Sequence, residues 1–148
     1  MGTESSGPLA GLRVLEVAQF AAGPLPALLL ADFGADVVKV EPPGGDGFRV
    51  WPPQVDQGDG AQYGLNYAVL NRNKRSVVLD LKNEDDRVRF LSLCAKADVL
   101  IENSRPGAMD RLGLGFTHVR EAQPKIVYCS VSGYGRGCVK TWGSSTRR

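Results

Sequence analysis

Two short segments of this 148-residue chain gather side chains that could bind a phosphate-bearing ligand. Leu70–Ser76 carries three cations and two amides in close succession. Arginine forks match phosphate oxygens in pairs, and lysine adds a compact point charge. Glu102–Gly107 carries Asn103 and Arg105, and Arg111 follows shortly after. Phosphate binding is thus one interpretation of both segments, and the amide of Asn103 can also bond a nucleobase. The plainer alternatives are a solvated loop for the first segment and a helix cap with surface arginines for the second.

A third segment has small side chains where a strand gives way to a helix. Ala21-Ala22-Gly23-Pro24 allows a ligand to approach the backbone, and a helix N-terminus offers N–H groups to an anion. A tight turn without a ligand is the alternative. No Gly-x-Gly-x-x-Gly follows the first strand and no Walker-type loop is present, which disfavours a dinucleotide-binding dehydrogenase and a P-loop enzyme.

Metal and thiol chemistry have little support in the sequence. The chain has one histidine, His118, and no Cys/His spacing suited to zinc, so we expect no metal. Cys94 falls in a helical pattern and Cys129 in a strand pattern, and both are expected to be buried apolar residues. The odd count of three cysteines argues against a disulfide framework.

Charge and hydropathy exclude further classes. The net charge of +2 depends on four cations in residues 136–148, and no basic or aromatic face accompanies them, so no nucleic-acid partner is expected. The apolar stretch Leu25–Ala31 is far too short to span a bilayer, and Met1–Pro8 lacks the features of a signal peptide. We expect no membrane partner, and a location in the cytoplasm or in the mitochondrial or peroxisomal matrix.

Strand and helix patterns alternate along the chain. Continuous apolar runs predict strands covered on both faces, and helical periodicity with capping residues predicts the helices between them. Asn83 is the expected cap of one helix, with acidic residues in its first turn. The predicted strands are Arg13–Ala18, Asp36–Glu41, Ser76–Asp80, Asp98–Glu102 and Lys125–Ser130. The predicted helices are Pro24–Phe33, Gln62–Leu70, Arg87–Ala97, Ala108–Leu112 and Thr117–Ala122.

This alternation predicts an α/β fold with a Rossmann-like parallel sheet and flanking helices. Open sheets of this kind bind ligands beyond the carboxyl ends of their strands. Four segments should therefore meet at that edge: Gln19–Gly23, Glu41–Gly45, Glu102–Gly107 and Ser132–Gly135.

Four blocks of the sequence, in this order, resemble the N-terminal part of the class III CoA-transferases. They are "GLRVLEVAQFAAGPLPALLLADFGADVVKVEPPGGD", "LNRNKRSVVLDLK", "ADVLIENSRPGAMDRLGLG" and "PKIVYCSVSGYG". This CaiB/BaiF-type family includes formyl-CoA and carnitine CoA-transferases and the related α-methylacyl-CoA racemases. The resemblance covers about Leu9–Gly135.

The resemblance implies a Rossmann-like large domain, of which this chain holds an incomplete part, a smaller domain, and two chains interlocked as a homodimer. It implies coenzyme A, carried as acyl-CoA, as the bound substrate. Three positions depart from the family pattern: Ala21 replaces a glutamine of some transferases, Pro42 a common arginine, and Ser104 an aromatic residue. The positions matched to CoA-binding stretches are Ala21, Ala22, Leu70, Asn71, Lys74, Arg75, Asn103, Ser104, Arg105 and Arg111.

In the family's transferases an aspartate attacks the thioester and forms an anhydride, which divides the transfer into easier steps. The resemblance places that aspartate beyond the end of this chain, after the Gly133-Tyr134-Gly135 turn. We therefore expect no catalytic residue among these 148 residues and no turnover by the chain alone.

The expected organisation is a flexible N-terminus at 1–8, a CoA-binding part at 9–135 and a divergent, disordered tail at 136–148. The function that the resemblance implies is the CoA-binding portion of an acyl-CoA:carboxylate CoA-transferase. The alternatives are a fragment of an α-methylacyl-CoA racemase, a non-catalytic acyl-CoA-binding module, and a fragment that folds poorly.

Overall fold

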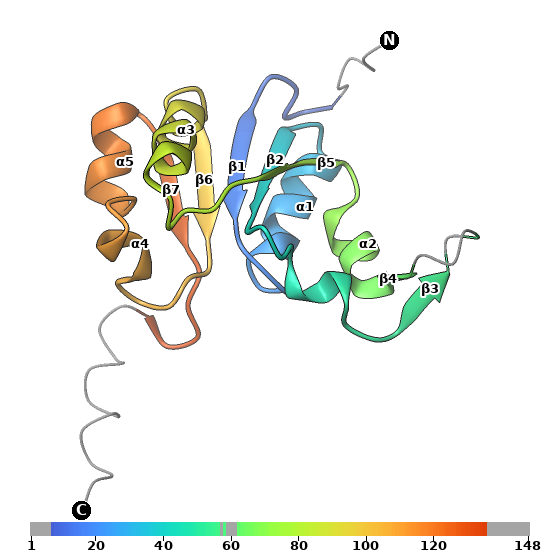
Figure 1. The fold of residues 1–148 in the computed structure, drawn as a ribbon. Helices are drawn as coiled ribbons and strands as arrows, with labels where there is room; N and C mark the ends of the chain where they lie inside the picture. Colours follow the sequence, from blue (N-terminus) through green and yellow to red (C-terminus); the bar gives the residue numbers. More distant parts are fainter. Residues whose placement is uncertain (1–6, 57, 59–61, 136–148) are drawn as a thin grey trace, which may run out of the picture.

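The computed structural model describes residues 7–56, 58 and 62–135, and its main body is a parallel sheet with helices on both faces (Figure 1). The sheet has five strands in the order β5-β2-β1-β6-β7, and every neighbouring pair is parallel. The predicted fold class is therefore confirmed. The strands are β1 (Arg13–Val17), β2 (Asp36–Glu41), β5 (Lys74–Val78), β6 (Val99–Glu102) and β7 (Val127–Ser130).

The connections hold the helices and a small second sheet. The helices are α1 (Pro24–Asp32), α2 (Leu65–Asn71), α3 (Glu84–Cys94), α4 (Ala108–Arg111) and α5 (Phe116–Ala122), with a 3-10 helix, η1 (Gly47–Arg49). An antiparallel hairpin pairs β3 (Gln54–Asp56) with β4 (Gln62–Gly64). The helix predicted at Gln62–Leu70 instead begins at Leu65, and its first three predicted residues form β4.

Two hydrophobic cores lie on opposite faces of the sheet, because successive strand residues point to opposite sides. On one face, Val14 and Ile101 pack against Ala27 of α1. On the other, Leu15 and Leu100 belong to a larger cluster. Figure 1 shows α3, α4 and α5 together on that second side of the sheet. The helices contribute Phe90, Cys94, Met109 and Val119 to the larger cluster.

The boundaries of α3 follow the predicted capping chemistry. The Asn83 side chain accepts hydrogen bonds from the N–H groups of Asp85 and Asp86 at 2.8 and 3.3 Å. Asp85, Asp86 and Glu84 occupy the first turn, where the helix dipole favours negative charge. The predicted cap is confirmed.

One of the two cysteine expectations is wrong. Cys94 is buried in the larger core, and burial raises the pKa of its thiol to about 12. Cys129 is exposed, because it lies on the edge strand β7. The neighbouring residue Tyr128 faces Phe116 of α5 at 5.8 Å between ring centroids, so Cys129 points to the opposite face.

Helix α1 is apolar around its whole circumference. Its sequence, Pro-Leu-Pro-Ala-Leu-Leu-Leu-Ala-Asp, buries one side against the sheet. The other side leaves Leu25, Leu29 and the following Phe33 exposed, at 48, 51 and 54% of their surface. Within the described part of the chain, no helix is long and apolar enough to cross a membrane.

We predict that the core under α3 carries much of the stability. Phe90 is completely buried, so Phe90→Ala removes a large side chain and leaves a cavity, at a cost of about 3–5 kcal/mol of unfolding free energy. Val88 lies on the same helix but is 60% exposed, and Val88→Ala should cost no more than about 0.5 kcal/mol. Urea unfolding of both variants would measure the difference, and equal costs would contradict this packing.

Candidate functional site

A cleft of about 460 Å³ lies at the carboxyl ends of the parallel strands. This is the edge at which open α/β sheets bind ligands, because the chain leaves the strands there in diverging directions. Residues from the ends of β1, β2, β5 and β6 and from around α4 form its walls. The lining consists of Val17, Ala18, Gln19, Phe20, Val40, Glu41, Pro42, Leu79, Asp80, Leu81, Lys82, Asn103, Ser104, Arg105, Met109 and Leu112.

A second hollow of about 360 Å³ adjoins the first. The two share Asn103, Ser104 and Arg105, which form a ridge between them. The second hollow is lined by Ala22, Asn103, Ser104, Arg105, Pro106, Val131, Ser132 and Gly133. The structure thus brings together parts of all four segments that the sequence placed at the carboxyl edge.

Asn103 is held by the protein's own backbone. Its side-chain Oδ1 accepts the N–H of Gln19 at 3.0 Å, and its Nδ2 donates to the carbonyl of Gln19 at 2.8 Å. The amide that the sequence suggested for a nucleobase therefore clamps the turn after β1. Asn103 still lines the cleft, so a ligand could touch its backbone and the outer surface of its side chain.

Two buried lysines, Lys39 and Lys74, share one carboxylate inside the protein. The Nζ of Lys39 lies 2.8 Å from Glu16 Oε1, and the Nζ of Lys74 lies 2.7 Å from Glu16 Oε2. All three side chains are no more than 1% exposed. Burial lowers the pKa of Lys74, and the neighbouring Glu16 partly opposes that shift.

The side chains of Leu70–Arg75 do not line the cleft, and Lys74 is instead bonded within the protein. Besides Glu16, the Nζ of Lys74 donates to the Pro24 carbonyl at 2.8 Å and to Asn71 Oδ1 at 3.1 Å. Lys74 and Asn71 thus tie β5 and α2 to the start of α1. Leu70, in α2, is half-buried and is absent from the walls of both hollows.

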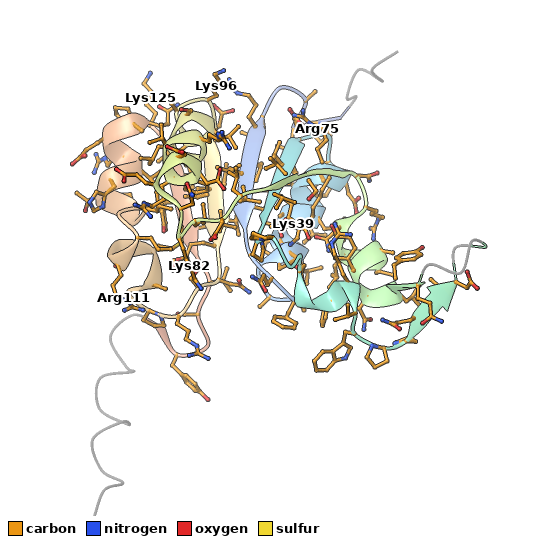
Figure 2. All side chains as sticks on the ribbon, viewed as in Figure 1. Lys39, Arg75, Lys82, Lys96, Arg111 and Lys125 are labelled. Atoms are coloured by element: carbon orange, nitrogen blue, oxygen red, sulfur yellow. The ribbon has the colours of Figure 1, made fainter. Side chains whose placement is uncertain are left out.

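Arg75 lies at the amino edge of the sheet, opposite the cleft. It is the second residue of β5, and it pairs with Asp36, the first residue of β2. Its Nη2 donates to Asp36 Oδ2 at 2.6 Å, and its Nε donates to Oδ1 at 3.1 Å. Figure 2 shows Arg75 toward one end of the molecule and Lys82 and Arg111 toward the other. Arg75 is therefore not positioned to meet a ligand in the cleft.

The cleft instead contains Leu79–Lys82, which the sequence reasoning missed as a binding segment. These residues directly follow β5 and line the cleft, with the Lys82 side chain exposed. The sequence contained the information needed, because Leu79–Lys82 are the last four residues of the "LNRNKRSVVLDLK" block. A strand predicted to stop at Asp80 already placed Lys82 at the carboxyl edge.

The remaining predicted positions are distributed around the two hollows. Arg105 is exposed on the shared ridge, and Ala22 lies in the second hollow. Ala21 is exposed in the turn before α1, outside both linings. Arg111 ends α4 and is exposed, with its Nη1 near Gly107. No cluster of three or more potential metal-binding side chains occurs among the residues that the structure describes.

Glu41, at the end of β2, is buried but heavily hydrogen-bonded. Burial alone raises the pKa of its carboxyl group, but donated hydrogen bonds outweigh that effect and hold the pKa well below its usual value. Arg49 donates to both oxygens at 2.7 and 2.8 Å, and its guanidinium also lies over the Tyr67 ring at 3.9 Å. Tyr67 and Ser76 donate hydroxyl bonds at 2.7 and 2.6 Å. The carboxylate thereby fixes one side of the cleft.

Comparison with known proteins agrees with this fold. The chain matches CoA-transferase family III over residues 9–145. It is 49% identical over 129 residues to succinyl-CoA:mesaconate CoA-transferase of Haloarcula hispanica, covering 87% of this chain and 33% of that protein. It is 44% identical over 131 residues to acetyl-CoA:oxalate CoA-transferase of Acetobacter aceti, covering 88% and 32%. A solved CAIB/BAIF family protein from Brucella suis superposes with a TM-score of 0.82 at 42% identity, covering 87% and 34%.

The fold is that of a Rossmann-like α/β protein, with a cleft at the carboxyl ends of its strands. The chain belongs to CoA-transferase family III, as its sequence resemblance predicted. It spans about a third of the length of the curated relatives described above.

We predict that Glu41 makes the stability of the fold depend on pH. Since its folded pKa lies below the ordinary 4.5, its stabilisation is complete at neutral pH. That stabilisation declines as the pH falls below about 4.5, because the unfolded state then takes up a proton that the folded carboxylate does not. Glu41→Gln should lower the urea midpoint at pH 7 and flatten its fall toward acid.

Asp36→Asn serves as the control for this measurement, because it removes an exposed ion pair at the opposite edge, and such pairs contribute little. Its midpoint should follow that of the parent at every pH. A Glu41→Gln profile with the same acid slope as the parent would contradict the role given to Glu41.

Proposed function

We propose that this chain supplies the coenzyme-A-binding part of an enzyme that transfers CoA between carboxylic acids. The observation that carries the proposal is the cleft at the carboxyl edge of a family III sheet, with the cations Lys82 and Arg105 in its walls. The relatives named above are CoA-transferases that act with mesaconate and oxalate, which supports small carboxylic acids as the acyl groups.

The two hollows suit the two ends of the ligand. In the larger cleft, Lys82 and Arg105 offer positive charge to the phosphates, since ammonium and guanidinium groups are the usual phosphate partners. Arg111 adds a third exposed cation toward the same end of the sheet (Figure 2). The smaller hollow, where Ala22 leaves room beside the backbone, receives the pantetheine and thioester end.

We further propose that the attacking carboxylate comes from outside the described residues. The acids at the cleft are engaged within the protein: Glu41 accepts the bonds described above, and Asp80 Oδ1 accepts the N–H of Lys82 at 3.0 Å. Glu102, at the end of β6, is buried and accepts the N–H of Ser104 at 2.7 Å. A nucleophile must be free to reach a thioester carbon, and these groups instead hold the walls in place.

We predict that coenzyme A binds the chain and that the exposed cations at the carboxyl end of the sheet decide its affinity. Lys82→Ala and Arg111→Ala should each weaken binding by about 1–3 kcal/mol, the scale of a hydrogen bond to a charged group. Isothermal titration of each variant with coenzyme A would measure the dissociation constants.

Arg75→Ala is the matched control, because it removes an exposed arginine of the opposite edge. Its affinity should stay within about twofold of the parent, which corresponds to less than about 0.5 kcal/mol. A larger loss in Arg75→Ala than in Lys82→Ala would contradict the cleft as the binding site, and a parent with no affinity for coenzyme A would overturn the proposal.

A second prediction concerns catalysis. Mixed with an acyl-CoA and a free dicarboxylate, the chain alone should form no new thioester, whereas a full-length relative assayed in parallel should. Chromatographic separation of the acyl-CoA products gives the readout. Turnover that is abolished by Asp80→Asn would contradict the expectation and make Asp80 the nucleophile.

A further inference from the structure

One turn in the cleft wall has an unfavourable backbone conformation. Phe20 has a φ of 63°, in the left-handed region where a Cβ atom crowds the neighbouring carbonyl oxygen. Residues in such conformations persist only where their surroundings hold them, and they are concentrated at functional sites. Phe20 lines the larger cleft, so its backbone conformation shapes the surface that a ligand meets.

Two side chains hold this turn. One follows β2 in the sequence and the other follows β6, and these are the two strands that flank β1 in the sheet. Asn103, past the end of β6, bonds the N–H and the carbonyl of Gln19. Asp46, in the loop past the end of β2, accepts the N–H of Phe20 through Oδ1 at 3.2 Å. Because β1 lies between β2 and β6, the turn is fastened from both sides.

Asp46 is itself held by several neighbours, and its Oδ1 also accepts the N–H of Phe48 at 2.9 Å. Its side chain is fully buried, its Oδ2 lies 2.9 Å from Nζ of Lys39, and its N–H donates to Glu41 Oε2 at 2.9 Å. The same Lys39 ammonium donates to the carbonyl of Ala18 at 2.6 Å, two residues before Phe20. The Lys39–Asp46 ion pair therefore ties the loop after β2 to the turn after β1.

The ring of Phe20 packs on the loop that contains Asp46. It meets Phe48 and Trp51 edge to face, with ring centroids 5.3 and 6.2 Å away. A Cβ at Gly47 would lie 2.6 Å from this ring, so the glycine makes the contact possible. The backbone and the ring of Phe20 thus both depend on the position of the loop.

We propose that Asp46 is a positioning residue for coenzyme A binding, which acts by holding Phe20 in its left-handed conformation. The identity of the ligand rests on the proposed function, whereas the hold on Phe20 exists without any ligand. Asp46 touches the turn and not the cleft: its side chain is buried behind Phe20 and is absent from the cleft lining.

The test uses the dependence of the Asp46 effect on the residue at position 20. Asp46→Ala is made in three backgrounds: Phe20, Phe20→Ala and Phe20→Gly. Glycine adopts positive φ without strain, whereas alanine does not. Only glycine at position 20 should therefore keep the turn in place without the hydrogen bond to Asp46. Asp46→Ala should weaken coenzyme A binding about tenfold in the Phe20 and Phe20→Ala backgrounds and no more than about twofold in Phe20→Gly.

Urea unfolding of the same six proteins provides a readout that needs no ligand. Asp46→Ala should lower the unfolding midpoint more in the Phe20→Ala background than in Phe20→Gly. A merely structural role of the buried ion pair would give equal losses in both backgrounds. Equal losses, in affinity or in midpoint, would overturn the proposal.

Asp98→Ala is the control, because Asp98 also accepts a backbone N–H of β1, that of Arg13 at 2.8 Å, but at the opposite end of the strand. Its effect should be the same in all three backgrounds and should leave coenzyme A affinity unchanged. If the parent chain binds no coenzyme A, the proposed function fails, and the unfolding comparison alone then supports or overturns the hold of Asp46 on Phe20.

Discussion

The fold depends on a carboxylate buried between two ammonium groups. Glu16 lies in the central strand β1 and faces Lys39 on β2 and Lys74 on β5. Isolated charges are costly to remove from water, and removing one partner of such a set leaves the others uncompensated. Each group here finds its remaining partners nearby, including Asp46, the Pro24 carbonyl and Asn71. The arrangement therefore specifies how three strands, one loop and two helices come together.

The same chemistry separates the cations of this chain into two kinds. Lys39 and Lys74 are surrounded by acceptors inside the protein and stabilise its frame. Lys82 and Arg105 stand at the cleft with exposed side chains. A buried cation whose donors are satisfied has little left for a ligand, whereas an exposed cation can exchange water for phosphate oxygens. Lysine thus stabilises the frame at position 74 and is offered for the proposed binding at position 82.

Much of this arrangement could be predicted from the sequence, and the failures have physical reasons. Apolar runs and capping residues are local signals, so the strands and the cap at Asn83 were found. The role of Lys74 was missed because its partner Glu16 is 58 residues away, and a lone sequence does not show that pairing. Asn103 was correctly placed at the carboxyl edge, but its amide is used by a backbone group 84 residues away.

Other differences arise from position within the sheet. Cys129 has the pattern of a buried strand, yet β7 lies at an edge and one face of it remains open. The predicted tail at 136–148 and most of the predicted flexible N-terminus lie outside the described residues. The division of the chain into these parts stays a prediction, as do the homodimer and the cellular compartment.

The apolar circumference of α1 has a practical consequence for anyone who handles this chain. A helix that is hydrophobic all round is typical of one enclosed on every side, yet Leu25, Leu29 and Phe33 meet water here. This exposed apolar face can bind environment-sensitive dyes and other apolar surfaces. We therefore expect purified material to adsorb to apolar surfaces and to self-associate as it is concentrated.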